Sequence, residues 1–197
     1  GNAILGAYTG ALGYIAGRSG LSTSLLMRRS FGAGAAVLPT LLLVVTQIGW
    51  FGVGIAMFSQ TFTTLLASHG FEVNMWLVIG LSGLVMSSSA YWGIKALTIV
   101  SVVAVPAIVV FGVISLAITG GTHEAVWATL WSSAPAADAV LPMASSVAIT
   151  VGSFISGGTC TPDFVRFAKN GPSAAVCTLV AFFLGNSLMF LFGAVGG

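Results

Sequence analysis

The stretch TQIGWFGVG, residues 46–54, lies in the middle of an apolar run from Ala35 to Phe58. That run is long enough to cross a bilayer, since a helical crossing takes about 20 residues. Gln47 and Trp50 are three positions apart, so they share one face of such a helix. An amide is costly at membrane depth unless it has a partner, and Trp is more usual at the membrane interface. We therefore interpret Gln47 and Trp50 as half of a binding site for a flat polar molecule.

The composition around this stretch is that of an integral membrane protein. Of the 197 residues, 57% are hydrophobic and 5% are charged, whereas a soluble domain carries about 25% charged residues. The net charge of +2 comes from few, dispersed basic residues, which argues against a nucleic-acid partner. The sequence has no Ser–His–Asp set, HExxH motif or phosphate loop, so we expect a protein that is not an enzyme and has no cofactor.

The hydrophobic pattern predicts an all-α membrane protein with one transmembrane domain over residues 1–197. Gly6 with Gly10, and Gly13 with Gly17, have the small-residue spacing that lets helix backbones touch in lipid. The chain opens with Gly1 inside a hydrophobic run, so we expect an incomplete domain within a larger membrane protein. The six expected spans are about 3–16, 35–58, 73–89, 96–119, 141–160 and 174–195.

The basic residues predict how the chain is oriented in the membrane. All six fall in the connections after the first, third and fifth spans. Cytoplasmic connections carry an excess of Lys and Arg, so these three connections are expected in the cytoplasm and both chain ends outside. The six residues are Arg18, Arg28, Arg29, Lys95, Arg166 and Lys169.

The fifth span contains the run VGSFISGGT, residues 151–159, which holds three glycines and three hydroxyl residues in nine positions. This composition is poor for a helix interior and predicts an unwound or loosened helix facing a cavity. Tight helix packing is the alternative reading of the glycines. Phe154 and Ser156 favour a site, because an aromatic face and a hydroxyl beside a break suit a heteroaromatic ligand.

Three further features follow this run. Thr161, Pro162 and Asp163 form the pattern of a helix start, with a hydroxyl N-cap, proline at the first helical position and an early acid. We expect a structural ion pair or surface charge for Asp163 and Arg166 rather than a gating role. For Asn186, in the sixth span, we expect a hydrogen bond between helices rather than a ligand contact.

Four runs of this sequence resemble a known family. The run QIGWFGVG, residues 47–54, resembles the third span of cytosine permeases in the nucleobase–cation symport family one. VGSFISGGT, continuing to DFVRF at residues 163–167, resembles their sixth span. LTIVSVVAVPAI (residues 97–108) and AFFLGNSLMF (residues 181–190) are similar to the same proteins, so the likeness covers essentially the whole chain. Pro162 departs from the family pattern.

The resemblance implies a twelve-span carrier with two inverted five-span repeats, of which this chain would be spans two to seven. It implies import of cytosine across the bacterial inner membrane, coupled to a cation, with sodium expected. The substrate ring would lie between Trp50 and Phe154, Gln47 would bind the pyrimidine edge, and Ser156 or the backbone around Gly157 would add polar contacts. The ion would bind spans that this chain lacks, so no metal ligand is named.

Two alternatives stay open from the residues alone. One is a carrier of the same fold for another ring, such as uracil, a purine, hydantoin or allantoin. The other is a channel or a structural membrane module, for which an aromatic pair at mid-span would have no purpose. The sequence does not decide the oligomeric state.

Overall fold

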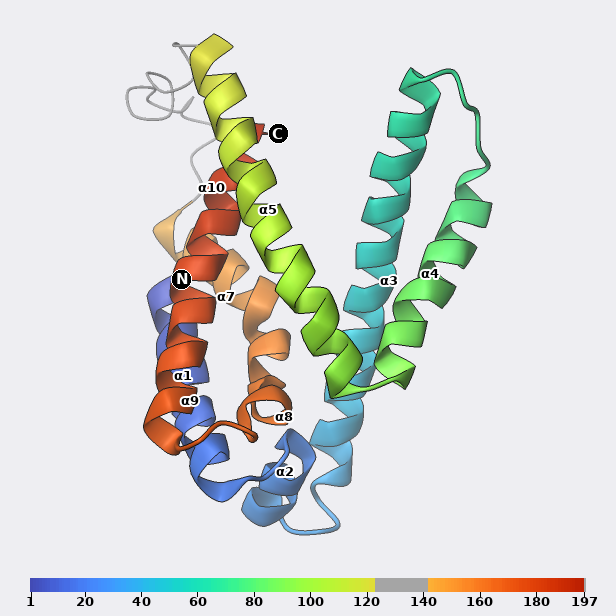
Figure 1. The fold of residues 1–197 in the computed structure, drawn as a ribbon. Coiled ribbons are helices and arrows are strands. Elements are labelled where there is room, and N and C mark those ends of the chain that lie inside the picture. Colours follow the sequence, from blue (N-terminus) through green and yellow to red (C-terminus); the bar gives the residue numbers. More distant parts are fainter. Residues whose placement is uncertain (123–141, 197) are drawn as a thin grey trace. The chain divides into compact units, whose positions relative to one another are not determined.

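The computed structural model describes residues 1–122 and 142–196, and every described regular element is helical (Figure 1). The expected start of the fifth span, Leu141, lies outside the described residues. The helices are α1 (Asn2–Ser19), α2 (Thr23–Phe31), α3 (Val37–Ser68), α4 (Met75–Tyr91), α5 (Ile94–Thr122), α7 (Met143–Thr159), α8 (Thr161–Val165), α9 (Gly171–Val180), the π-helical turn η1 (Ala181–Gly185) and α10 (Asn186–Gly196).

The chain divides into two compact units, and each is described by itself. The first unit contains Gly1–Ala36 and Pro106–Gly197, and the second contains Val37–Val105. The division falls inside α5, between Val105 and Pro106, although the helix runs through the proline without interruption.

Three helices among the described residues are long and apolar enough to cross a membrane. They are Val37–Ser68, Ile94–Thr119 and Gly171–Ala194, and α4 is a shorter apolar helix. Their large apolar side chains are mostly exposed, Val45 and Phe111 being examples. Exposed apolar surface on this scale is unusual for a soluble monomer but is what lipid requires. The all-helical membrane class expected from composition is confirmed at this level.

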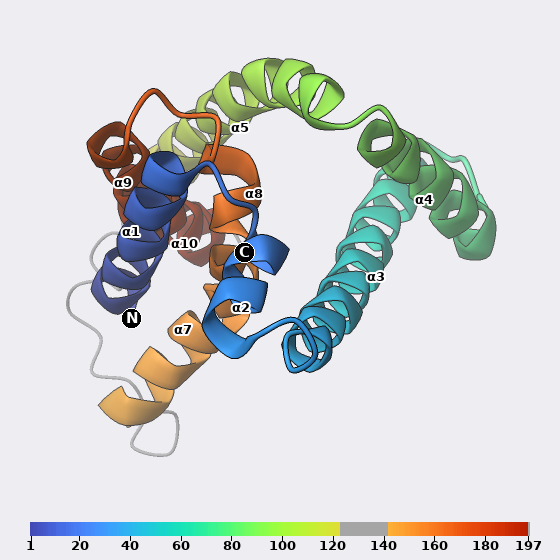
Figure 2. The ribbon, with the colours of Figure 1, turned by 90° about the horizontal axis from the view of Figure 1, so that it is seen from below.

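The first unit is built on close packing of α1 against α9 and η1. Figure 2 shows α1 lying alongside α9. A Cβ added at Gly13 would lie 2.5 Å from Thr178 Oγ1, and one added at Gly17 would lie 2.6 Å from Ala174 Cβ. Gly6 faces Phe183, at 3.4 Å from its Cβ. The expectation that these glycines let two helix backbones touch is confirmed.

A polar cluster joins the start of α1 to the start of α10. Asn186 Nδ2 donates to Asn2 Oδ1 at 2.8 Å, and Asn2 Nδ2 donates to Ser187 Oγ at 2.8 Å. Asn186 is only 7% exposed. The expectation of a helix-packing hydrogen bond at Asn186 is therefore confirmed.

The expectation of an unwound helix at residues 151–159 is wrong, because α7 is helical from Met143 to Thr159. Hydroxyl groups on this helix donate back to carbonyls four residues earlier, as Ser153 does to Ile149 at 2.8 Å. Such bonds are compatible with helical geometry. Serine and threonine therefore do not open the helix here.

The break comes instead at Cys160, directly before Thr161 and Pro162. Pro162 has no N–H for the carbonyl four residues earlier, and its ring disfavours helical backbone in the residue before it. A five-residue helix, α8, then starts with proline in its first turn and Asp163 after it. Its N-cap is Cys160 and not Thr161, so the expected start is shifted by one residue.

The second unit contains the antiparallel hairpin of α3 and α4 (Figure 1). Ser59 is buried and its hydroxyl lies 3.2 Å from that of Ser82, on the facing helix. Ile55 packs beside Gly83, with its Cδ1 3.4 Å from the position of an added Cβ. Small residues thus let α3 and α4 approach each other closely. Helix α3 continues to Ser68, ten residues past the expected end of that span at Phe58.

Candidate substrate site

The first part of the predicted site is on α3. Gln47 and Trp50 are one turn apart in the middle of the helix, as the spacing predicted. Trp50 is 45% exposed within the structure, and Gln47 is partly exposed. A Cβ added at Gly49 or Gly54 would meet nothing within 4 Å. The indole therefore stands beside bare backbone that leaves room for a ligand.

The second part is on α7, where Gly157 is central. Residues advance by about 100° per position around an α-helix, so Phe154 projects about 60° to one side of Gly157 and Ser156 about 100° to the other. A Cβ added at Gly157 would meet nothing within 4 Å. The helix thus presents an open backbone strip between an aromatic ring and a hydroxyl group, a surface on which a planar ring can lie.

Ser156 differs from its neighbouring hydroxyl residues on α7. Thr150, Ser153 and Thr159 each donate to a carbonyl of their own helix, at 2.9, 2.8 and 2.7 Å. Within the described part of the chain, no hydrogen bond engages the hydroxyl of Ser156. That hydroxyl is consequently the one in this part of α7 that is available to a ligand.

Phe154 has an aromatic neighbour that sequence reasoning did not assign to the site. The ring of Phe190, on α10, packs edge-to-face against it with centroids 5.9 Å apart and planes at 78°. This contact packs the Phe154 ring against α10, and the Phe154 side chain stays 38% exposed. The only sequence signal was that Phe190 closes the run at residues 181–190, and no spacing rule connects residues so far apart.

The charged pair after the break makes contacts that differ from an ion pair. Asp163 Oδ1 accepts the backbone N–H of Thr23 at 3.1 Å. The guanidinium carbon of Arg166 lies 4.7 Å from the ring centroid of Phe167. The Asp163 bond links α8 to the start of α2, whereas the Arg166 contact joins two adjacent residues.

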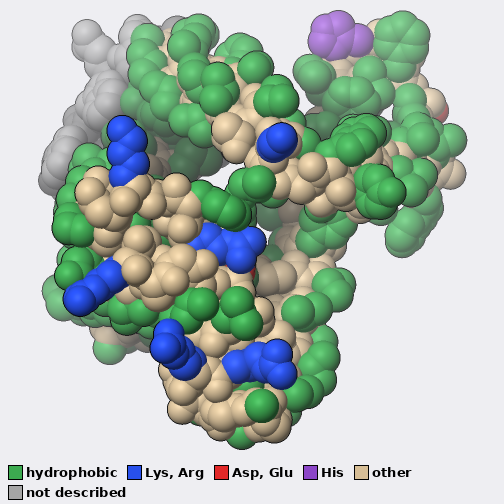
Figure 3. Space-filling view, turned by 60° about the horizontal axis from the view of Figure 1, so that its bottom comes forward, with side chains coloured by type: hydrophobic (Ala, Val, Ile, Leu, Met, Phe, Trp, Pro, Cys, Tyr) green, Lys and Arg blue, Asp and Glu red, His purple; other side chains and the backbone are tan. Residues whose placement is uncertain are grey.

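Basic side chains gather at the end of the first unit that carries α2 and α8 (Figure 3). The residues of this unit that contribute are Arg18, Arg28, Arg29, Arg166 and Lys169.

The described residues hold no group of three or more His, Cys, Asp or Glu side chains that could bind a metal ion.

The described hollows of the second unit do not include the predicted site residues. One, on the α3–α4 hairpin, has a volume of about 410 Å³ and an almost wholly apolar lining that includes Phe58, Phe62 and Leu81. Another, of about 500 Å³, is lined by residues between Gln60 and Ser68. Gln47 and Trp50 lie in the second unit and Phe154, Ser156 and Gly157 in the first, so the pairing of Trp50 with Phe154 stays a prediction.

The fold is that of an all-helical protein of the membrane, and α3 and α7 each carry aromatic and polar groups beside open helix backbone. The family model described as "Permease for cytosine/purines, uracil, thiamine, allantoin" matches residues 1–197. The chain belongs to this family. Permeases are transporters and not enzymes, in agreement with the class expected from the sequence.

Curated relatives support the same assignment. The cytosine permeases of Escherichia coli strains K12, O6:H1 and O157:H7 are each 49% identical to this chain over 199 residues. The alignments cover 100% of this chain and 45% of each relative, so the chain spans a little under half of their length. No solved structure gives a significant match.

Proposed function

We propose that this chain is part of a secondary active transporter that imports cytosine together with a cation by alternating access. The observation that carries the proposal is the 49% identity to cytosine permeases across the whole chain. The aromatic and polar groups of α3 and α7 are those that a nucleobase needs. The coupling ion is sodium, bound by spans outside this chain, and no other cofactor takes part.

The proposed binding residues are Gln47, Trp50, Phe154, Ser156 and Gly157. Stacking of a base on an aromatic side chain is worth about 1–3 kcal/mol, but stacking alone accepts any flat ring. The amide of Gln47 has both donors and an acceptor, so it selects the edge of the base. A site that satisfies such hydrogen bonds rejects analogues that leave them unmade. The open strip at Gly157 supports this arrangement on the α7 side.

The proposed full architecture has twelve spans in two inverted five-span repeats, with this chain supplying six spans, numbered two to seven. The protein lies in the bacterial inner membrane with both ends of this segment outside. Sorting of all six basic residues to alternate connections supports that orientation. Inverted repeats that rock around a site at mid-membrane are a common transporter design.

The proposal is tested by uptake of radiolabelled cytosine into cells that produce the full-length protein. Trp50→Ala should lower uptake at least about tenfold at equal membrane levels, because the stacking surface is lost. Trp76→Ala is the matched control, since Trp76 is 79% exposed on α4. Uptake that is unchanged in Trp50→Ala would refute the proposed site. Uptake that is independent of a sodium gradient would refute sodium coupling.

A second candidate is a same-fold carrier of another ring. The family description, which names purines, uracil, thiamine and allantoin beside cytosine, favours this alternative over unrelated functions. Competition of each compound, and of hydantoin, against labelled cytosine separates the two. If an unlabelled compound competes better than cytosine itself, that compound is the substrate. Uptake that fails to saturate would instead indicate a channel.

A further inference from the structure

The break between α7 and α8 leaves a carbonyl that its own helix does not satisfy. In an uninterrupted helix the N–H of Asp163 would bond the carbonyl of Thr159. It bonds Cys160 instead, at 3.0 Å. The hydroxyl of Thr23 donates to the Thr159 carbonyl at 3.2 Å, from a position 136 residues earlier in the chain. A residue of α2 therefore caps the end of the helix that carries Phe154 and Ser156.

The start of α2 is satisfied by the same junction. The first N–H groups of a helix have no partner within it. The N–H of Thr23, the first residue of α2, donates to Asp163 Oδ1 at 3.1 Å, which also places a negative charge at the helix N-terminus. Ser22 supplies the ordinary local cap, accepting the N–H of Leu25 at 3.4 Å. Thr23 is 6% exposed, and both of its bonds are part-buried.

The two bonds form a clamp, here called the Thr23 clamp, in which Thr23 donates twice: its N–H to Asp163 and its hydroxyl to the Thr159 carbonyl. The hydroxyl of Thr159 donates to Ile155 at 2.7 Å and lies 2.9 Å from the hydroxyl of Tyr8. Because a hydroxyl has one hydrogen, Tyr8 must be the donor in the second bond. The end of α7 is thus fixed from α1 as well as from α2.

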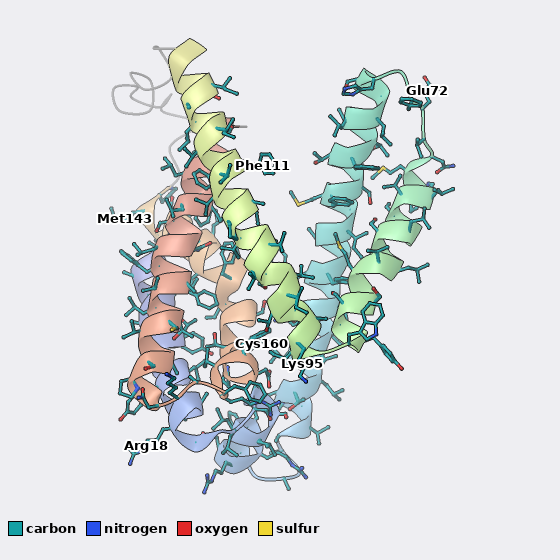
Figure 4. The ribbon with its side chains drawn as sticks, in the orientation of Figure 1. Arg18, Glu72, Lys95, Phe111, Met143 and Cys160 are labelled. Atoms are coloured by element: carbon teal, nitrogen blue, oxygen red, sulfur yellow. The ribbon has the colours of Figure 1, made fainter. Side chains whose placement is uncertain are left out.

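The clamp lies close to the proposed substrate groups. Ser156 and Gly157 are three and two residues before Thr159, which is about 5 Å or less along a helix axis. Gly158, which lies between Gly157 and Thr159, packs directly on α1, since an added Cβ there would lie 2.8 Å from Thr9 Cγ2. Figure 4 shows Cys160 at the turn where α7 gives way to α8. A shift or rotation of this turn would carry Ser156 with it.

We propose that Asp163 is a positioning residue for substrate binding, which acts through the Thr23 clamp. Its carboxylate holds Thr23 so that the end of α7 keeps the rotation in which Ser156 and Gly157 face the ligand. This inference rests on the proposed function for its consequence in transport, but the clamp itself does not. In this proposal α2 stabilises the end of α7, the helix that contacts the base.

The test uses the full-length protein and two readouts. The first is the rate at which N-ethylmaleimide modifies Cys160, followed by mass spectrometry of its peptide. The second is cytosine uptake, expressed as KM and as turnover per inserted molecule. Asp163→Ala and Thr23→Val each remove one side of the clamp. Asp163→Asn keeps an oxygen acceptor and Thr23→Ser keeps the hydroxyl, so these are the conservative rescue variants.

The clamp predicts that Cys160 modification accelerates about fivefold or more in Asp163→Ala and Thr23→Val, with a matching rise in KM, and stays within about twofold in the conservative variants. The double variant should be no worse than the more affected single one. Glu72→Ala, which removes an exposed acid outside the clamp, should leave both readouts unchanged.

Other results would overturn the inference. Unchanged Cys160 modification in both Asp163→Ala and Thr23→Val would show that the clamp does not hold the turn. A loss confined to the amount of inserted protein, with KM unaltered, would show a purely structural role. If Asp163→Ala fails to insert, Thr23→Val against Thr23→Ser decides the question. If wild-type protein takes up no cytosine, the proposed function fails while the Cys160 readout still decides the clamp.

Discussion

Asn186 donates a hydrogen bond of 2.8 Å to Asn2, a residue 184 positions earlier, and so ties the start of α10, directly after the π-helical turn, to the start of α1. π-helical turns occur often at functional positions within helices. Here the two residues that follow the turn, Asn186 and Ser187, form one cluster with Asn2 of α1. The polar groups satisfy one another where the surrounding helices offer few other partners.

We predict that Asn186→Leu lowers the free energy of unfolding by about 1–2 kcal/mol, because Asn2 loses a partner in an apolar setting. The measurement is thermal or denaturant unfolding of the full-length protein in detergent. The double variant Asn2→Leu with Asn186→Leu should recover part of the loss, since no amide is then left unpaired. A double variant less stable than the sum of both singles would contradict this account.

Gly13 and Gly10 form a matched pair for testing the contact between α1 and α9. An alanine Cβ at Gly13 would lie 2.5 Å from Thr178 Oγ1 and 3.0 Å from the carbonyl oxygen of Ala174, whereas at Gly10 the nearest atom is 3.7 Å away. We expect Gly13→Ala to destabilise the protein by about 1–3 kcal/mol through overpacking, and Gly10→Ala to be tolerated. Equal melting temperatures for the two variants would disprove the packing argument.

Gly157 and Gly158 are adjacent in the chain but differ in their surroundings. An added Cβ at Gly158 would press on Thr9 at 2.8 Å, while one at Gly157 would meet nothing within 4 Å. We predict that Gly158→Ala lowers the melting temperature. Gly157→Ala should keep the melting temperature but raise the KM for cytosine, because the methyl group would occupy the proposed ligand strip. Unfolding and uptake measured on the same preparations separate the two effects. An unchanged KM in Gly157→Ala would remove this glycine from the site.

Ser156 and Ser153 provide a test of which hydroxyl serves the ligand. Ser153 already donates to Ile149, whereas Ser156 has no partner among the described residues. Ser156→Ala should weaken cytosine binding about three- to tenfold, the value of one hydrogen bond. Ser153→Ala should change binding less than twofold, as an order-of-magnitude expectation, because its bond is internal to the helix. Isothermal titration of purified protein measures both. The reverse ranking would exclude Ser156 as a substrate contact.

The helical class, the small-residue contact of α1 and the hydrogen bond of Asn186 could be predicted from the sequence. Each depends on a local pattern: continuous apolar runs, glycines four apart, and an isolated amide within a span. The prediction of an unwound helix at residues 151–159 was wrong, although glycines and serines in such a run are typical of a break. The helix persists there since its hydroxyls bond their own carbonyls, and it ends only where Pro162 withdraws an N–H.

The sequence by itself determined that this chain is helical, belongs in lipid and carries its aromatic and amide groups within apolar runs, because these properties follow from composition and from spacing along one helix. Only the tertiary structure decided that Phe190 packs on Phe154 and that Thr23 clamps Asp163 and Thr159. Such pairs join residues far apart in the chain, and which groups meet depends on how helices pack, which no local pattern encodes.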